Sequence, residues 1–379
     1  MTVDLDRQRD LLGWFGAHAR PMPWRSLHAP ADPYAVVTSE LMLQQTRVDT
    51  VRDYFARWLA RWPDWQSLAQ ASVDQVLEQW TGLGYYNRAR NLHRLAQGVV
   101  RDHGGRLPTD TASLRGLPGI GPYTAGAVAS IAFGMPVSLV DGNVARVLAR
   151  WSGLRLDPTT GAGKIAVWQM ADAELAEHGP AHAAPGHWNQ ALMELGATVC
   201  APRTPTCGDC PVAARCLARR QGVQREIPPT RSRPAVIAIQ AWYVVVSDAN
   251  GLVLLARRPD RGRWAGLWEP PGAEGPDARD VIARWADRQG VVLDSALHPV
   301  VHVLTHRRYQ ATPLPARLGP LAIEVASLGY TAARWQTPDE AVAQAGGLSR
   351  LGQRLVAAVA DRQARRQAAK AAAPHLHKS

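Results

Sequence analysis

The chain has 379 residues, and its 43 Lys and Arg against 32 Asp and Glu give a formal net charge of +11 at pH 7. A hydrophobic fraction of 46% with 20% charged residues is ordinary for a globular protein, and no apolar run long enough for a membrane-spanning helix is present. Residues 1–10 are charged and lack an apolar stretch, so we expect no secretory signal and a cytoplasmic location. The basic excess favours a polyanionic partner without identifying it as nucleic acid.

The first part of the chain has the apolar spacing of helices joined by short turns. No strand-like alternation of apolar and polar residues interrupts it. The expected helices cover residues 4–19, 34–45, 48–61, 72–79, 85–103, 123–133, 144–151, 164–178 and 188–195. We therefore expect an all-α domain over residues 1–216, which ends in a cluster of cysteines.

The composition changes after this domain. Residues 217–235 are rich in Arg and Pro and are predicted to be an interdomain linker. A mixed α+β domain is expected over residues 236–361, followed by a basic, Ala-rich and disordered tail over residues 362–379. Within the α+β domain the pattern predicts strands at 236–247, 252–257, 300–304 and 321–325, and helices at 277–289 and 349–360.

All four cysteines lie within one short segment, at Cys200, Cys207, Cys210 and Cys216. Four thiolates so close together can wrap one metal ion or one cluster in a reducing compartment. Zinc ribbons usually pair two Cys-x-x-Cys knuckles, whereas this segment has one. A 4Fe–4S cluster also takes four thiolates, so the spacing leaves both groups open.

A second motif is the glycine-rich turn of residues 117–125, which contains Gly119 and Gly121. Two glycines around one apolar residue favour a tight hairpin between helices, and Pro122 suits the first turn of the next helix. Unpaired backbone N–H groups at such a helix start can bind a DNA phosphate. A turn without any ligand is the alternative.

Two carboxylates stand out near these motifs. Glu40 lies within an apolar helix, where it is either an exposed helical residue or a desolvated acid with a raised pKa. Asp141 precedes the helix expected at 144–151, where it either caps that helix or stabilises positive charge on a sugar as a base departs. One acid and one charged stabiliser are the pair that glycoside cleavage requires.

Taken in order, these motifs resemble the helix–hairpin–helix DNA glycosylase superfamily, and within it the MutY-type adenine glycosylases. The resemblance extends over nearly the whole chain, through residues 24–25, 40–48, 82–86, 117–126, 140–150, 189–196 and the cysteine segment. It implies an N-terminal helical glycosylase domain and a 4Fe–4S cluster on the four cysteines.

The resemblance also implies roles for individual residues. Glu40 matches the acid that protonates N7 of adenine, and Asp141 matches the carboxylate that stabilises the oxocarbenium ion. Tyr123 and Asn143 match residues that support these two carboxylates. Arg25 and Gln190 match residues that line the adenine pocket. The residues that match positions near the lesion are Gln45, Thr46, Leu83 and Tyr85.

The C-terminal domain resembles a Nudix-like fold, beginning at residues 257–272. The carboxylate set that Nudix hydrolases use for metal is missing after Gly272, so nucleotide hydrolysis is not expected. In MutY-type enzymes this domain reads 8-oxoguanine with a Phe-Ser-His loop. Here Thr305 and His306 match the last two positions, and Leu304 replaces the Phe.

The resemblance implies removal of adenine opposite 8-oxoguanine or guanine in double-stranded DNA by a monomeric enzyme, leaving an abasic site. Tyr123 occupies the position where endonuclease III enzymes carry a Schiff-base lysine, which argues against strand cleavage. Two rival hypotheses are a bifunctional glycosylase/lyase and a catalytically silent DNA-binding protein on the same scaffold. Arg203, Arg215, Arg219 and Arg220 near the cysteines are expected either to contact the DNA backbone or to form a solvated basic face.

Overall fold

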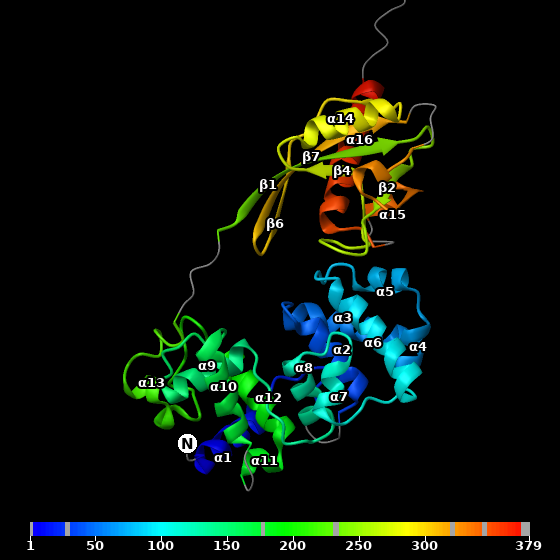
Figure 1. Cartoon of the computed structure of the whole chain (residues 1–379). Helices are drawn as coiled ribbons and strands as arrows, with labels where there is room; N and C mark the ends of the chain where they lie inside the picture. Colours follow the sequence, from blue (N-terminus) through cyan, green and yellow to red (C-terminus); the bar gives the residue numbers. More distant parts are fainter. Residues whose placement is uncertain are drawn as a thin grey trace, which may run out of the picture. The chain divides into compact units, whose positions relative to one another are not determined.

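The computed structural model describes residues 3–26, 31–175, 179–229, 235–318, 323–342 and 347–372. The chain divides into two compact units, shown in Figure 1. The first unit consists of Met1–Ala71 and Asn91–Ser232, and the second of Ser72–Arg90 and Arg233–Ser379. No helix among the described residues has both the length and the apolar character needed to cross a membrane.

The first unit is built from helices alone within its described residues. Its elements are α1 (Leu5–His18), α2 (Pro33–Leu43), α3 (Val48–Arg61), α4 (Trp65–Gln70), most of α6 (Asn87–His103), α7 (Thr111–Gly116), α8 (Pro122–Ala127), the π-helix η1 (Val128–Ala132), α9 (Gly142–Ser152), α10 (Gly161–Glu174), α11 (Pro180–Ala183), α12 (Pro185–Thr198), the 3₁₀ turn η2 (Ala213–Arg215) and α13 (Leu217–Arg220). The expected all-α class is confirmed. The helix expected at 123–133 is α8 running into η1, and α4 and α7 were too short for periodicity to reveal.

A single apolar core holds α1, α9 and α12 together. Leu11, Val147 and Trp188 are fully buried in it. Ala218 and Ile227 belong to the same core. The first part of the segment expected to be a linker, through at least Ile227, therefore packs within the first unit, because its apolar residues have a core to enter.

The second unit contains α5 (Val73–Trp80) and a mixed sheet with helices on its faces. Its other elements are β1 (Ile237–Ser247), β2 (Val253–Arg257), β3 (Trp268–Glu269), β4 (Gly272–Glu274), α14 (Ala278–Arg288), β5 (Val292–Leu293), β6 (Val300–Leu304), β7 (Arg307–Arg317), η3 (Ala326–Leu328), β8 (Ala332–Gln336), α15 (Pro338–Val342) and α16 (Arg350–Ala372). The main strand order is β3-β2-β1-β7-β5, with β4 beside β1, β6 beside β7 and β8 beside β2. β1 and β7 pair in parallel along their whole length, and the other pairs are antiparallel.

Alternation along β1 divides the core between two helices. Val244 and Val246 pack with α14 residues on one face, whereas Tyr243 and Val245 belong to the clusters that α16 completes on the other face. Figure 1 shows α14 and α16 on either side of the sheet. The α+β class expected for this region is confirmed.

Two expectations for the second unit are wrong, and one long strand was not predicted. That strand is β7, which contains Pro313 and Pro315, residues that are unusual within a central strand; it forms through its full-length pairing with β1. Of the strand expected at 321–325, residues 321–322 lie outside the described residues and 323–325 form no strand. The tail expected to be disordered is helical through residue 372, because Ala, Arg and Gln favour helices and Arg362 donates to the Ser295 carbonyl at 2.6 Å. Residues 373–379 lie outside the described residues.

Candidate active site

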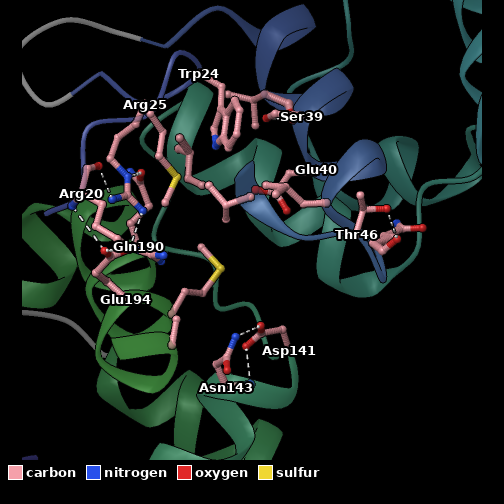
Figure 2. A pocket seen from close by; sticks show the side chains of 18 of the residues that line it. Arg20, Trp24, Arg25, Ser39, Glu40, Thr46, Asp141, Asn143, Gln190 and Glu194 are labelled. Atoms are coloured by element: carbon pink, nitrogen blue, oxygen red, sulfur yellow. Dashed lines mark hydrogen bonds and ion pairs between the residues drawn. The ribbon is translucent and has the colours of Figure 1, made fainter. Parts of the chain in front are cut away.

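A cavity of about 540 Å³ in the first unit brings together most of the residues singled out from the sequence. Its lining includes Arg25, Glu40, Gln45, Thr46, Tyr123, Asp141, Asn143 and Gln190. These residues come from segments far apart in the sequence, mainly around α2, α8, α9 and α12. Figure 2 shows Glu40 and Asp141 on different walls, with Gln190 and Arg25 on another. The volume falls in the range of small-molecule sites.

Glu40 is a buried acid. It is 7% exposed and lies in the part of α2 that is buried around the helix, so the exposed-residue alternative is wrong. The Tyr123 hydroxyl donates to Glu40 Oε2 at 2.5 Å. Burial raises the pKa of Glu40 to about 7, assisted by the Asp141 charge and opposed by the Tyr123 hydrogen bond and Arg25. A large fraction of this carboxyl is therefore protonated at neutral pH.

Asp141 caps α9, as one of the two alternatives drawn from the sequence expects, and its position in the cavity leaves the catalytic alternative open. Its Oδ1 caps α9, accepting from the backbone N–H groups of Asn143 at 2.9 Å and Val144 at 2.8 Å. Its Oδ2 accepts from the Asn143 side-chain amide at 2.9 Å. Burial raises the pKa of Asp141, while these hydrogen bonds oppose the rise. The cap fixes a carboxylate that also lines the cavity.

Arg20 and Glu194 complete the Gln190 wall, and sequence reasoning missed both. Glu194 is one helical turn after Gln190 on α12, a spacing that places them on the same face. Arg25 donates to Gln190 Oε1 at 3.2 Å and to Glu194 Oε2 at 3.0 Å. Arg20 pairs with the same carboxylate. Glu194 in a buried apolar helix was the one available signal.

The glycine-rich turn connects α7 to α8 as expected. Gly119 has φ +79°, and a Cβ there would lie 2.6 Å from Cβ of Asn91, so only glycine fits without displacement. Gly121 is the N-cap of α8 and supplies no side-chain cap. The first backbone N–H groups of α8 thus receive no side-chain cap from the residue that precedes the helix.

The remaining expected residues lie in the second unit. Leu83 is 6% exposed, whereas Tyr85 is 49% exposed and adopts a left-handed conformation with φ 49°. Thr305 and His306 form the exposed turn between β6 and β7. The hydroxyls of Tyr85 and Thr305 share a hydrogen bond of 2.8 Å. Tertiary structure thus joins two residues that the family resemblance assigns to the lesion.

The four cysteines lie within the described residues and none forms a disulfide. Burial raises the pKa of the Cys210 thiol to about 11. A hydrogen bond with the backbone of Val212 opposes this rise, and the charges of the other three cysteines add to it. Among the described residues, no three His, Cys, Asp or Glu side chains are arranged to hold one metal ion.

Two arginines attach the cysteine segment to α9. Arg146 donates to the Cys200 carbonyl at 2.8 Å and to Asn143 Oδ1 at 2.8 Å. The buried Arg150 donates to Cys200 Sγ at 3.2 Å and to the Ala201 carbonyl at 2.8 Å.

Arg215, which was expected either to contact the DNA backbone or to lie on a solvated basic face, forms ion pairs within the first unit. It forms ion pairs with Asp4 at 3.2 Å, Asp6 at 3.4 Å and Asp10 at 2.7 Å. Three carboxylates at the start of α1 and along it neutralise this guanidinium. Arg219 and Arg220 are exposed, so both alternatives, contact with the DNA backbone and a solvated basic face, stay open for them.

Comparison with known proteins agrees with this architecture. Residues 38–170 match the family model of the HhH-GPD superfamily of base excision DNA repair proteins, and residues 241–357 match the NUDIX domain model. Adenine DNA glycosylase of Mus musculus is 36% identical over 87% of this chain and 74% of its own length. The Homo sapiens protein of the same name is 35% identical over 87% and 70%, and that of Buchnera aphidicola subsp. Schizaphis graminum is 28% identical over 81% and 86%. The chain belongs to the adenine DNA glycosylase family.

Proposed function

We propose that the protein is a base-excision repair glycosylase that removes adenine opposite 8-oxoguanine or guanine and leaves an abasic site. The observation that carries the proposal is that Glu40, whose pKa is about 7, and Asp141 both line the same cavity. The relatives that match most of the chain carry the name adenine DNA glycosylase.

The cavity suits a purine that has been flipped out of the duplex. Glu40 donates its proton to N7 of the base, and the C1′–N9 bond breaks with its electron pair leaving on adenine. Asp141 stabilises the positive charge that develops on the sugar. A water molecule then adds to C1′ and gives its proton to the Glu40 carboxylate, which restores the acid.

The donor and stabiliser are held for these steps by their neighbours. Tyr123 occupies Oε2 of Glu40, which leaves Oε1 to carry the proton. Asn143 and the start of α9 hold Asp141. The described residues that line the cavity include no lysine, so an amine nucleophile is not supplied there and we propose base removal without strand cleavage.

DNA binding is proposed for the glycine-rich turn and for the second unit. The start of α8 offers backbone N–H groups to a phosphate. Tyr85, Thr305 and His306 are proposed to meet the base opposite adenine, with Gln45, Thr46 and Leu83 supporting the opened duplex. Flipping costs less at a mispair, which favours mispaired adenine over normal A·T.

A 4Fe–4S cluster is proposed on Cys200, Cys207, Cys210 and Cys216. The four cysteines lie in one short segment, their thiols influence one another electrostatically, and four thiolates are the ligand set that such a cluster takes. When bound, the cluster supplies a rigid tie for this segment. The excision steps need no electron transfer and involve only the residues of the cavity.

Single-turnover release of adenine tests the proposal. Duplexes with adenine opposite 8-oxoguanine, guanine or thymine, and one with thymine glycol opposite adenine, are compared. We expect fast release from the first, slower release from the second and none from the others, with no borohydride-trapped adduct. Absence of adenine release from cluster-replete protein would overturn the proposal, and trapping with cutting at thymine glycol would favour the lyase.

A further inference from the structure

One wall of the cavity is organised around Glu194, which the proposed mechanism does not use. Its side chain is almost completely buried. Its Oε1 accepts from Arg20 Nε, and its Oε2 accepts from Arg20 Nη2 at 3.2 Å and from Arg25 Nη2 at 3.0 Å. Burial acts to raise the pKa of Glu194, but the hydrogen bonds and charges of the two arginines bring it below its ordinary value. Glu194 is therefore the charged centre of this wall.

Arg25 is held on several sides. Besides Glu194, it donates from Nη1 to the Arg20 carbonyl at 3.0 Å and from Nε to Gln190 Oε1 at 3.2 Å. Its guanidinium also lies over the Phe15 ring, 5.3 Å from the centroid. A planar guanidinium held at all three nitrogens has one position.

The Gln190 amide consequently has one orientation. Its Oε1 faces the Arg25 donor, and its Nε2 donates to the Gly186 carbonyl at 3.2 Å. Rotation by half a turn would place the NH₂ group against the Arg25 N–H and the oxygen against the Gly186 carbonyl. Both contacts would then be repulsive, whereas an unsupported glutamine amide rotates freely between the two states.

We propose that Glu194 is a specificity-determining positioning residue, which fixes the Gln190 amide through Arg25 so that the cavity distinguishes adenine from a purine with a carbonyl at C6. The inference rests on the proposed function. Adenine carries an amino donor at C6 and hypoxanthine a carbonyl acceptor. A fixed amide matches one of these edges and leaves an unsatisfied group with the other, while a rotating amide satisfies both.

The test is the ratio of single-turnover release rates for adenine and hypoxanthine, each opposite 8-oxoguanine, in the full-length protein. This ratio is independent of the fraction of protein that is folded. For Glu194→Gln we expect it to fall about tenfold, roughly the effect of one net hydrogen bond. The matched control is Glu174→Gln, since Glu174 is also buried and paired, with Arg7, but does not line the cavity. Its ratio should equal that of the unmodified protein.

A double variant checks that the effect passes through Gln190. In a Gln190→Ala background, Glu194→Gln should leave the ratio unchanged, because no amide is left to orient. If Glu194→Gln does not fold, Glu194→Asp serves in its place: the shorter carboxylate reaches the two arginines less well, so a smaller fall is expected. An unchanged ratio in the folded single variant would overturn the inference while leaving the proposed function standing. Lack of adenine release by the unmodified protein would overturn the proposed function, and the inference with it.

Discussion

Arg146 and Asn143 are joined by a hydrogen bond of 2.8 Å from Arg146 Nη2 to Asn143 Oδ1. Asn143 in turn donates to Asp141, and Arg146 also donates to the carbonyl of Cys200. The cysteine segment is thus two side chains away from the carboxylate proposed to stabilise the sugar cation.

This relationship predicts a defect in Arg146→Met. The long apolar side chain retains bulk but releases the Asn143 amide, so we expect adenine release to slow by tenfold or more, in the range that misplaced catalytic groups cost. Arg155→Met is the control, since Arg155 is exposed and forms an ion pair with the equally exposed Glu226 at 3.6 Å. Equal single-turnover rates for the two variants would contradict the prediction.

Glu40 predicts the pH dependence of the rate. Because its pKa is about 7 and the acid form is the reactive one, adenine release should fall as pH rises through 7. A rate that stays level up to pH 9 would argue against Glu40 as the acid.

The raised pKa of Glu40 also predicts that replacing this residue increases the free energy of unfolding. Its folded-state pKa is raised above the unfolded value, so the folded protein binds more protons, and stability is lost as pH rises between about 4.5 and 7. Glu40→Gln should therefore be inactive, yet more stable above pH 7 by on the order of 2–3 kcal/mol. The difference should vanish near pH 4. Urea unfolding at both pH values measures it, and equal differences at the two would refute the explanation.

The helix-capping role of Asp141 and its proposed catalytic role should be separable by substitution. Asn caps helices about as well as Asp, so Asp141→Asn should keep the melting temperature within a few degrees. Loss of the negative charge should lower adenine release by about a hundredfold or more. Asp141→Ala should lose both the rate and about 1 kcal/mol of stability. Normal activity in Asp141→Asn would remove the charge from the mechanism.

The ion pairs of Arg215 predict a local structural role for this residue. Arg215→Gln should lower the melting temperature by a few degrees, because partly exposed pairs contribute up to about 1 kcal/mol each. It should leave the salt dependence of DNA affinity unchanged. The exposed Arg219, changed to Gln, should instead reduce that salt dependence if it contacts a phosphate. The opposite assignment of the two effects would show that Arg215 contacts DNA.

Features that depend on a few neighbouring residues could be predicted from the sequence. The cysteine spacing, the turn around Gly119, the cap position of Asp141 and the helical texture of the first unit are local, because turns, caps and periodicity act over one or two helical turns. The comparisons confirmed the family and both domain types.

Contacts between distant segments arise when the chain folds and could not be predicted from local patterns. Arg25 and Glu194 are 169 positions apart, and Tyr85 and Thr305 are 220 apart, so no spacing rule connects them. β7 forms despite Pro313 and Pro315 because β1 lies beside it over its full length. Burial, which places the pKa of Glu40 near 7 rather than near its ordinary value, likewise exists only once α2 has packed against its neighbours.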